Sequence, residues 1–180
     1  MRKGLILYGA PATGKDTITA ELVHREPCFE HFKRLKFGSG RSAGYRMIDH
    51  GQAQILRQSP EMILWENSRY GSTYFVDRPG LERVWDLGRV PVVHLGQVEA
   101  VEAIARDSAS GAIWTVVELH CQPAILYDRI RSRQTGDDVQ RFAAVAHTNR
   151  LPVADIRIDT GSVPVAEAAE KIADLVHRSS

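Results

Sequence analysis

The chain has 180 residues, of which 43% are hydrophobic and 25% are charged, and this composition is typical of one globular domain. A chain of this length buries roughly two thirds of the surface that it exposes when unfolded, which excludes a disordered or fibrous protein. Its 23 Lys and Arg residues nearly balance its 22 Asp and Glu residues, giving a formal net charge of +1. Because no overall positive field exists, we expect neither nucleic acid nor a membrane as a partner, and we expect local groups to bind any anion.

Cysteine content and the N-terminal residues bear on the compartment. Cys28 and Cys121 are too few for a disulfide framework or a four-ligand zinc site, so we expect core thiols in a reducing environment. The first apolar run reaches the Gly-Ala-Pro stretch at 9–11 too soon for a signal peptide or a membrane span. The expected location is therefore the cytoplasm.

The first predicted unit is a strand, a loop and a helix. The apolar run at 4–8 predicts a buried parallel strand, and the Gly/Pro/Ala/Thr stretch at 9–14 predicts a loop. Ile18, Leu22 and Val23 share one face of a predicted helix over 15–25. This order is typical of the start of an α/β domain.

Residues 27–76 follow a shorter and more polar pattern, which predicts a small inserted lobe. A short helix is expected after Asp49, which can cap it. The candidate strands of the lobe lie near 35–37, 45–48, 62–65 and 73–76.

Alternation of strands and helices resumes at Asp77. Asp77 can cap a helix that ends at Gly88. Further strands are expected at 90–95, 113–119 and 155–159, and further helices at 98–106, 123–133, 138–147 and 163–177. We therefore predict a single α/β domain over 1–180 with a five-stranded parallel sheet flanked by helices and joined by right-handed crossovers. Its core would comprise 1–26 and 77–180.

A phosphate-binding loop is the strongest motif. Residues 9–15 spell G-x-x-x-x-G-K between a hydrophobic strand and a helix, as a P-loop requires. In such a loop the backbone N–H groups and the helix N-terminus present partial positive charge to phosphate, and Lys15 adds a full charge. The fold class expected is thus a P-loop NTPase. The expected nucleotide-binding residues are Gly9, Ala10, Pro11, Ala12, Thr13, Gly14, Lys15, Asp16 and Thr17.

The residue after Lys15 departs from the usual P-loop. A Ser or Thr normally follows the lysine and binds Mg²⁺, whereas this chain has Asp16 and then Thr17. Asp16 either binds the metal or points away and caps the helix, and the sequence leaves both alternatives open. Asp16 and Thr17 are the candidate metal ligands. A GTPase is excluded because no Asn/Thr-Lys-x-Asp motif follows.

An arginine-rich segment surrounds the polar break at 134–138. Arg129 and Arg133 are four residues apart and share a helix face, and Arg141 follows the break. Phosphoryl transfer needs cationic donors around the transferred group, and arginine grips phosphate in a bidentate way. The alternative is a solvated basic helix, but the position after the P-loop and the central strand favours a helical lid over about 130–147. Lys15, Arg129, Arg133 and Arg141 are the expected catalytic residues.

Together these motifs resemble the guanylate kinase family of nucleoside monophosphate kinases over nearly the whole chain. The resemblance rests on the P-loop, the inserted lobe, Tyr-Gly-Ser at 70–72 and the helix pattern L-x-x-R-I-x-x-R at 126–133. Gly-Lys-Asp at 14–16 is also similar to the ribose 1,5-bisphosphate kinases. The resemblance implies a kinase that uses ATP and Mg²⁺ and transfers the γ-phosphoryl group to a phosphorylated acceptor, such as GMP or a specialised analogue, bound in the lobe.

Several residue roles follow from that resemblance. Tyr45 and Tyr70 would bond the acceptor phosphate, and Glu66 would read the guanine edge beside Ser72. Asp159 would lie in the strand-end loop that touches adenine. The family's arginine-rich stretch is reduced to Arg41, with Arg46 as a substitute, and Gly96 follows the strand at 90–95 where the family has an Asp nearby. The expected acceptor-binding residues are Arg41, Tyr45, Arg46, Glu66, Tyr70, Ser72 and Gly96.

These departures indicate a rebuilt acceptor pocket and leave alternatives. A sugar phosphate or another metabolite is one alternative acceptor, and a hydroxyl acceptor would need Asp16, Asp49, Glu66 or Asp77 as a base. A non-catalytic binding module is another alternative, which the retention of Lys15 disfavours. The expected partner is a small phosphate acceptor, and the expected state is a monomer or a homodimer.

Overall fold

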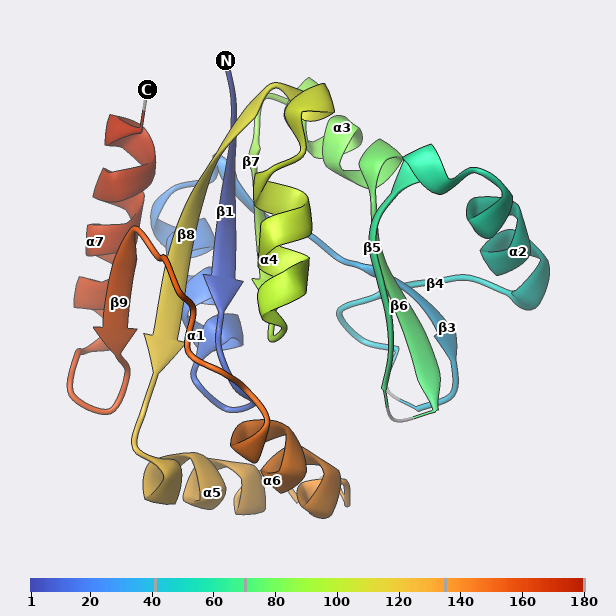
Figure 1. The fold of residues 1–180 in the computed structure, drawn as a ribbon. Helices are drawn as coiled ribbons and strands as arrows, with labels where there is room; N and C mark the ends of the chain where they lie inside the picture. The colour runs from blue at the N-terminus through green and yellow to red at the C-terminus, as the bar shows by residue number, and fades with distance from the viewer. Residues whose placement is uncertain (41, 70, 135, 180) are drawn as a thin grey trace.

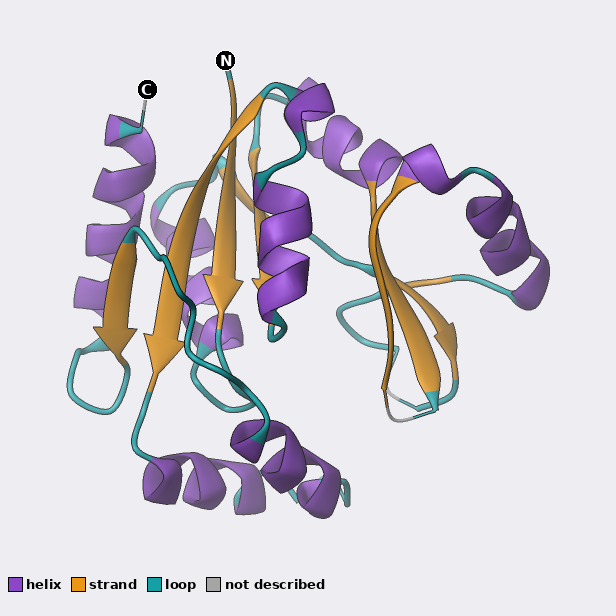
Figure 2. Ribbon diagram, viewed as in Figure 1, coloured by secondary structure: helices purple, strands orange, loops and turns teal. Residues whose placement is uncertain are grey.

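The computed structural model describes residues 1–40, 42–69, 71–134 and 136–179, which form two sheets with flanking helices (Figures 1 and 2). The larger sheet, the core sheet, is parallel and has the order β2-β7-β1-β8-β9. Its strands are β1 (Arg2–Tyr8), β2 (Phe29–His31), β7 (Val90–Leu95), β8 (Ala112–His120) and β9 (Ile156–Asp159).

Helices cover both faces of the core sheet. Successive residues of a strand point to opposite faces, so Leu5 and Leu7 join one buried cluster while Ile6 and Tyr8 join another. The first cluster is closed by α1 (Lys15–Arg25) and α7 (Val165–Arg178), and the second by α3 (Arg78–Asp86) and α4 (Val98–Ala105). The near-continuous apolar strands of the sequence follow from this two-sided burial.

Four strands form the second sheet, beside the core (Figure 1). Helix α2 (His50–Gln58) begins with a capping box between Asp49 and Gln52 and packs on one face of this sheet against Leu35 and Phe75. The strands are β3 (Leu35–Gly38), β4 (Arg46–Met47), β5 (Ile63–Arg69) and β6 (Ser72–Asp77), in the order β4-β3-β6-β5, and the 3-10 helix η1 (Pro60–Met62) precedes β5.

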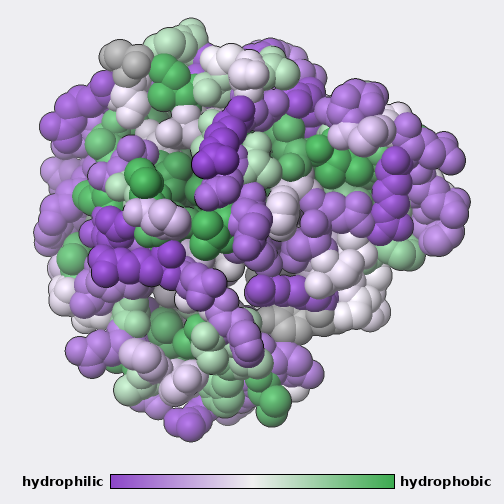
Figure 3. All heavy atoms as spheres, viewed as in Figure 1, coloured by the Kyte–Doolittle hydropathy of each residue, from purple (hydrophilic) through white to green (hydrophobic). Residues whose placement is uncertain are grey.

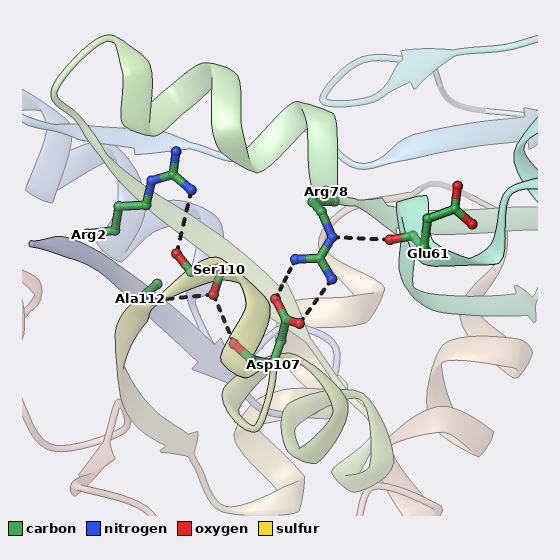
Figure 4. Close-up of polar contacts among 6 residues, drawn as sticks. All are labelled: Arg2, Glu61, Arg78, Asp107, Ser110 and Ala112. Carbon is green, nitrogen blue, oxygen red and sulfur yellow. Dashed lines mark hydrogen bonds and ion pairs between the residues drawn. The ribbon is translucent and has the colours of Figure 1, made fainter.

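Arg78 joins the second sheet to the core (Figure 4). Its two terminal nitrogens donate to the Asp107 carboxylate at 2.8 and 2.9 Å, and its Nε donates to the Glu61 carbonyl at 3.1 Å. The Arg78 guanidinium holds the pKa of Asp107 below its ordinary value. Ser110 of η2 (Ser108–Ser110) donates to the Asp107 carbonyl at 3.0 Å and accepts from Ala112 at 3.3 Å, which fixes this loop at the start of β8.

Two further helices lie beyond the carboxyl ends of the core strands (Figure 1). They are α5 (Pro123–Arg131) and α6 (Asp138–Ala146). Leu126 and Ile130 of α5 form a buried cluster with Ala10 and Ala12 of the loop after β1. The arginine-rich segment is therefore packed against the P-loop.

The predicted five-stranded parallel sheet is confirmed. Its fifth strand is β2 at 29–31, inside the segment expected to form the lobe at 27–76. The core therefore extends past residue 26, and the helix expected to reach residue 133 ends at Arg131.

Cys28 and Cys121 are free thiols, each partly buried. Among the described residues, no helix is both long and apolar enough to cross a membrane.

Candidate functional site

The loop at 9–14 has the backbone of a phosphate cradle. Gly14 has φ +94° and immediately precedes α1, and Ala12 has φ +66°, a conformation that residues with a side chain rarely adopt. A Cβ at Gly9 would lie 2.4 Å from the carbonyl oxygen of Leu119, so only glycine fits there. Because α1 starts at Lys15, its first backbone N–H groups have no acceptor within the helix and can bind an anion.

Lys15 folds over this loop. Its Nζ donates to the carbonyl oxygens of Gly9 and Ala10 at 2.6 and 2.8 Å and to Thr13 Oγ1 at 3.3 Å. Burial lowers the pKa of Lys15 to about 7, with the nearby Arg34 and Arg133 adding smaller effects in the same direction. An anion in the loop would restore the charged form of the lysine.

A cleft of about 680 Å³ opens between the P-loop, the second sheet and the α5–α6 segment. Hydrophilic residues border this part of the molecule on the face shown in Figure 3. Among the described residues that line the cleft, two carry carboxylates, Asp16 and Asp137, and Asp137 binds Arg141 Nε at 2.6 Å. The cationic lining residues are Lys15, Arg34, Lys36, Arg69, Arg133 and Arg141. The cleft is therefore suited to a ligand with several negative charges.

One wall of the cleft is the face of the second sheet that turns away from α2. Lys36, Tyr74 and Asn67 lie opposite one another across β3, β6 and β5, so they share this face. The Arg34 guanidinium lies 5.2 Å from the centre of the Tyr74 ring. Lys36 is only 3% exposed, and its Nζ donates to the Ser39 carbonyl at 2.6 Å. The wall thus presents two cations held against an aromatic ring.

Asn67 and Arg69 add polar groups to the same wall. Asn67 Oδ1 is buried and accepts no hydrogen bond from any described residue. With its amide oxygen turned toward Arg69, Gln97 accepts from Arg69 Nε at 3.1 Å and from Nη2 at 3.2 Å. An unsatisfied buried acceptor is costly, so a donor from a bound ligand or from water is expected at Asn67.

Asp16 points toward His94. Its Oδ1 lies 3.3 Å from His94 Nδ1, and the hydrogen bond with His94 holds the pKa of Asp16 well below its ordinary value. On the other side of the ring, His94 Nε2 lies 2.7 Å from Thr19 Oγ1, and burial lowers the pKa of His94 to about 4. Of the two alternatives for Asp16, helix capping is not observed among the described residues, because no side chain forms a capping hydrogen bond at the start of α1. Thr17 is exposed and lies outside the cleft lining.

The cleft brings together about half of the expected site residues. Ala10 and Thr13 do not line the cleft, but the Ala10 carbonyl and the Thr13 hydroxyl accept hydrogen bonds from Lys15. The expected residues that line the cleft are Gly9, Pro11, Ala12, Gly14, Lys15, Asp16, Tyr45, Gly96, Arg133 and Arg141.

Several expected acceptor residues lie elsewhere. Glu66 precedes Asn67 on β5 and so points to the opposite face, where its carboxylate binds Arg57 of α2 at 2.5 Å. Arg46 pairs with the buried Asp77, and Ser72 donates to the Ser39 carbonyl at 2.9 Å. None of the three lines the cleft. Arg41 and Tyr70 lie outside the described residues.

Arg129 and Asp159 also lie outside the cleft lining. Arg129 donates to the Thr160 carbonyl at 2.8 Å, to Thr160 Oγ1 at 3.2 Å and to the Ala12 carbonyl at 3.3 Å, and it does not line the cleft. It joins α5 to the P-loop and to the loop after β9, which is a positioning role. Asp159 accepts from the Gly161 backbone N–H at 2.8 Å and so shapes that loop, also outside the cleft lining.

Part of the cleft was not predicted from the sequence. One signal was available. Arg34 and Lys36 flank the buried Leu35 and are two residues apart, which is the spacing of side chains on one face of a strand. No comparable signal marks the others, because Asn67, Arg69 and Gln97 meet only through the pairing of distant elements. The missed lining residues are Arg34, Lys36, Asn67, Arg69, Tyr74, His94 and Gln97.

Comparison with known proteins supports the fold and does not identify the residues of the site. No protein-family model matches the sequence, and no curated protein matches it. A guanylate kinase from Anaplasma phagocytophilum superposes with a TM-score of 0.62 at 15% identity, covering 98% of this chain and 85% of that one. The chain has a P-loop kinase-like fold.

Two further solved structures share this kinase-like fold. One is described as APE1195, with a TM-score of 0.55 and 14% identity over 98% of this chain and 97% of that one. The other is described as a sugar kinase from Janibacter sp. HTCC2649, with a TM-score of 0.51 and 13% identity over 97% and 95%. At such low identity the similarity shows the fold alone.

Proposed function

We propose that the protein is an ATP-dependent kinase that transfers the γ-phosphoryl group to a phosphorylated small molecule. One observation carries the proposal. The P-loop lysine shares a single cleft with five other cationic side chains, whereas the described lining includes two carboxylates, each engaged by a basic group. Two phosphorylated substrates in one cleft would supply the negative charge that this arrangement lacks.

The donor ATP would bind on the P-loop side of the cleft. The N–H groups at the start of α1 and the Lys15 ammonium are placed to hold its phosphates. Mg²⁺ prefers oxygen ligands, and Asp16 offers a carboxylate on the cleft wall, with the exposed Thr17 hydroxyl next along the helix. When bound, the ion would neutralise charge on the β- and γ-phosphates.

Arg133 and Arg141 would act on the transferred group. They flank the break between α5 and α6, and both line the cleft. Guanidinium groups there stabilise charge on the equatorial oxygens in the transition state, and closure of residues 130–147 as a lid would exclude water. Arg129 would hold the base of this lid against the P-loop.

The acceptor would bind against the second sheet, which would serve as the acceptor lobe. Arg34, Lys36 and Tyr45 are placed to bind its phosphate. A phosphate oxygen is already anionic at neutral pH and needs alignment rather than a base, whereas a hydroxyl needs a carboxylate within reach. Asp16 and Asp137 are each paired, which favours the phosphorylated acceptor.

The place of Glu66 favours a second candidate acceptor. A nucleoside monophosphate such as GMP follows from the family resemblance, but the carboxylate expected to read guanine lies on the α2 side of the sheet. A sugar phosphate needs no such carboxylate, and the buried Asn67 Oδ1 is available to a hydroxyl donor. We therefore keep a phosphorylated sugar beside the nucleoside monophosphate.

The test is an ADP-release assay with ATP, Mg²⁺ and a panel of acceptors. The panel holds GMP and the other nucleoside monophosphates, ribose 1,5-bisphosphate, and unphosphorylated sugars and nucleosides. We expect turnover with at least one phosphorylated acceptor and none with its unphosphorylated counterpart. Turnover only with unphosphorylated compounds would overturn the proposed acceptor class, and no acceptor-dependent turnover would favour a binding module.

A further inference from the structure

Three potential metal ligands converge at the rim of the cleft. Asp16 comes from the first turn of α1, His31 from the end of β2 and His94 from β7. One ligand atom from each residue lies within 4.8 Å of the other two. The carboxylate is exposed and both imidazoles are partly buried, so the group can be reached by an ion from solvent.

The spacing of the first pair already suits a metal. Asp16 Oδ1 and His94 Nδ1 are 3.3 Å apart. Two ligands that each bind zinc at about 2.0–2.1 Å in tetrahedral geometry are themselves roughly 3.3 Å apart. The His31 ring stacks on the His94 ring with centroids 4.5 Å apart and a 30° tilt, which brings one of its nitrogens within 4.8 Å of the other two ligand atoms.

Thr19 gives His94 the support that a ligand histidine has. The Thr19 hydroxyl is buried and lies 2.7 Å from His94 Nε2. Histidines that bind metal generally donate their second ring N–H to such an acceptor, which fixes the tautomer. With an ion bound, Nε2–H would donate to Thr19 and the Nδ1 lone pair would face the ion, which would replace the hydrogen bond between His94 and Asp16.

We propose that Asp16, His31 and His94 bind one divalent transition-metal ion of the zinc or manganese class, with open coordination positions toward the cleft. Two imidazoles and one carboxylate suit Zn²⁺, Mn²⁺, Fe²⁺ and Co²⁺, whereas Mg²⁺ selects oxygen ligands. Asp16 and His94 also line the cleft, so a bound ion would face it. Asp16 is also the ligand offered for Mg²⁺ in the proposed function, so the two ions would share it, and binding is measured without nucleotide so that it can fail separately from the kinase activity.

Cobalt provides a direct probe of this site. The metal-free protein is titrated with Co²⁺ while the visible absorption of the ion is followed, and Zn²⁺ or Mg²⁺ is then added as competitor. We expect one equivalent of Co²⁺ to saturate the protein, micromolar Zn²⁺ to displace it and millimolar Mg²⁺ to leave it bound. Substitutions D16N, H31Q and H94Q should each weaken binding at least about tenfold.

A matched control is His147→Gln, because His147 is exposed and lies at the end of α6 away from these ligands. It should bind Co²⁺ like the wild type. The proposal is overturned if no saturable absorption develops, if Mg²⁺ competes as well as Zn²⁺, or if D16N and H31Q keep wild-type affinity. These two variants test the proposal even if the partly buried His94 does not tolerate substitution, because Asp16 is exposed and circular dichroism shows whether the variants fold.

Discussion

Lys36 lies opposite Tyr74 across the β3–β6 pair, with its Nζ 5.8 Å from the centre of the tyrosine ring. Tyr45 approaches the same ring at 5.3 Å between centroids, and the Arg34 guanidinium lies 5.2 Å from its centre. Strand pairing therefore holds two cations and two phenol rings on one wall of the cleft. A preorganised wall of this kind can position an acceptor without large rearrangement.

Arg34→Met tests the role of that wall. Loss of a charge-assisted contact to phosphate costs about 1.5–3 kcal/mol, so we expect the KM for the acceptor to rise at least about tenfold. The KM for ATP should stay within about twofold, because Arg34 lies on the acceptor side. Arg106→Met is the control, since Arg106 is 78% exposed and distant from the cleft lining. Equal changes in both KM values would argue against an acceptor-specific wall.

Glu66→Gln separates the structural account from the family resemblance. Glu66 binds Arg57 on the α2 side, and an exposed pair of this kind is worth about 1 kcal/mol or less. We expect kcat and both KM values to stay close to wild type. A large rise in the KM for GMP alone would show instead that this carboxylate reads guanine.

How much of the structure could be predicted from the sequence depends on how far apart the interacting residues lie along the chain. The strand, loop and helix at 4–25 were predictable because their pattern is local. Strand β2 has three residues and only one fully buried apolar side chain, Phe29, so its place at the sheet edge was not visible. The sequence did not show that Arg46 and Glu66 lie outside the cleft lining, because their partners, Asp77 and Arg57, are set by tertiary pairing.

Arg129→Met tests the positioning role. The guanidinium holds the Thr160 loop and the Ala12 carbonyl together, so its loss should lower the free energy of unfolding by about 1–3 kcal/mol. Thermal denaturation measures this change, and Arg131→Met, on the exposed side of α5, is the control. A fall in kcat of two orders of magnitude with unchanged stability would return Arg129 to the catalytic group.

Arg78→Met tests the link between the second sheet and the core. Because Arg78 depresses the pKa of Asp107 in the folded state, the pair contributes stability above the ordinary carboxyl pKa and loses it as the pH falls through the folded pKa. We expect the variant to lose about 1–3 kcal/mol at pH 7 and to show a weaker decline in stability on acidification.

Denaturant unfolding across pH 3 to 7 provides the measurement for this pair. Lys171→Met is the matched control, because Lys171 forms an exposed pair with Glu167 on α7. A variant that loses stability by the same amount at every pH would mean that Arg78 acts through packing rather than through the charge of Asp107.

The most direct test of the central claim is ADP release by the wild type and by Lys15→Ala on the same acceptor panel. In the proposed function Lys15 would supply the positive charge over the phosphates, and removing such a group costs several kcal/mol of transition-state stabilisation. We predict acceptor-dependent turnover in the wild type and a loss of at least about 100-fold in the variant, with the melting temperature little changed. Wild-type turnover in folded Lys15→Ala would contradict the assignment of this cleft as the site of phosphoryl transfer.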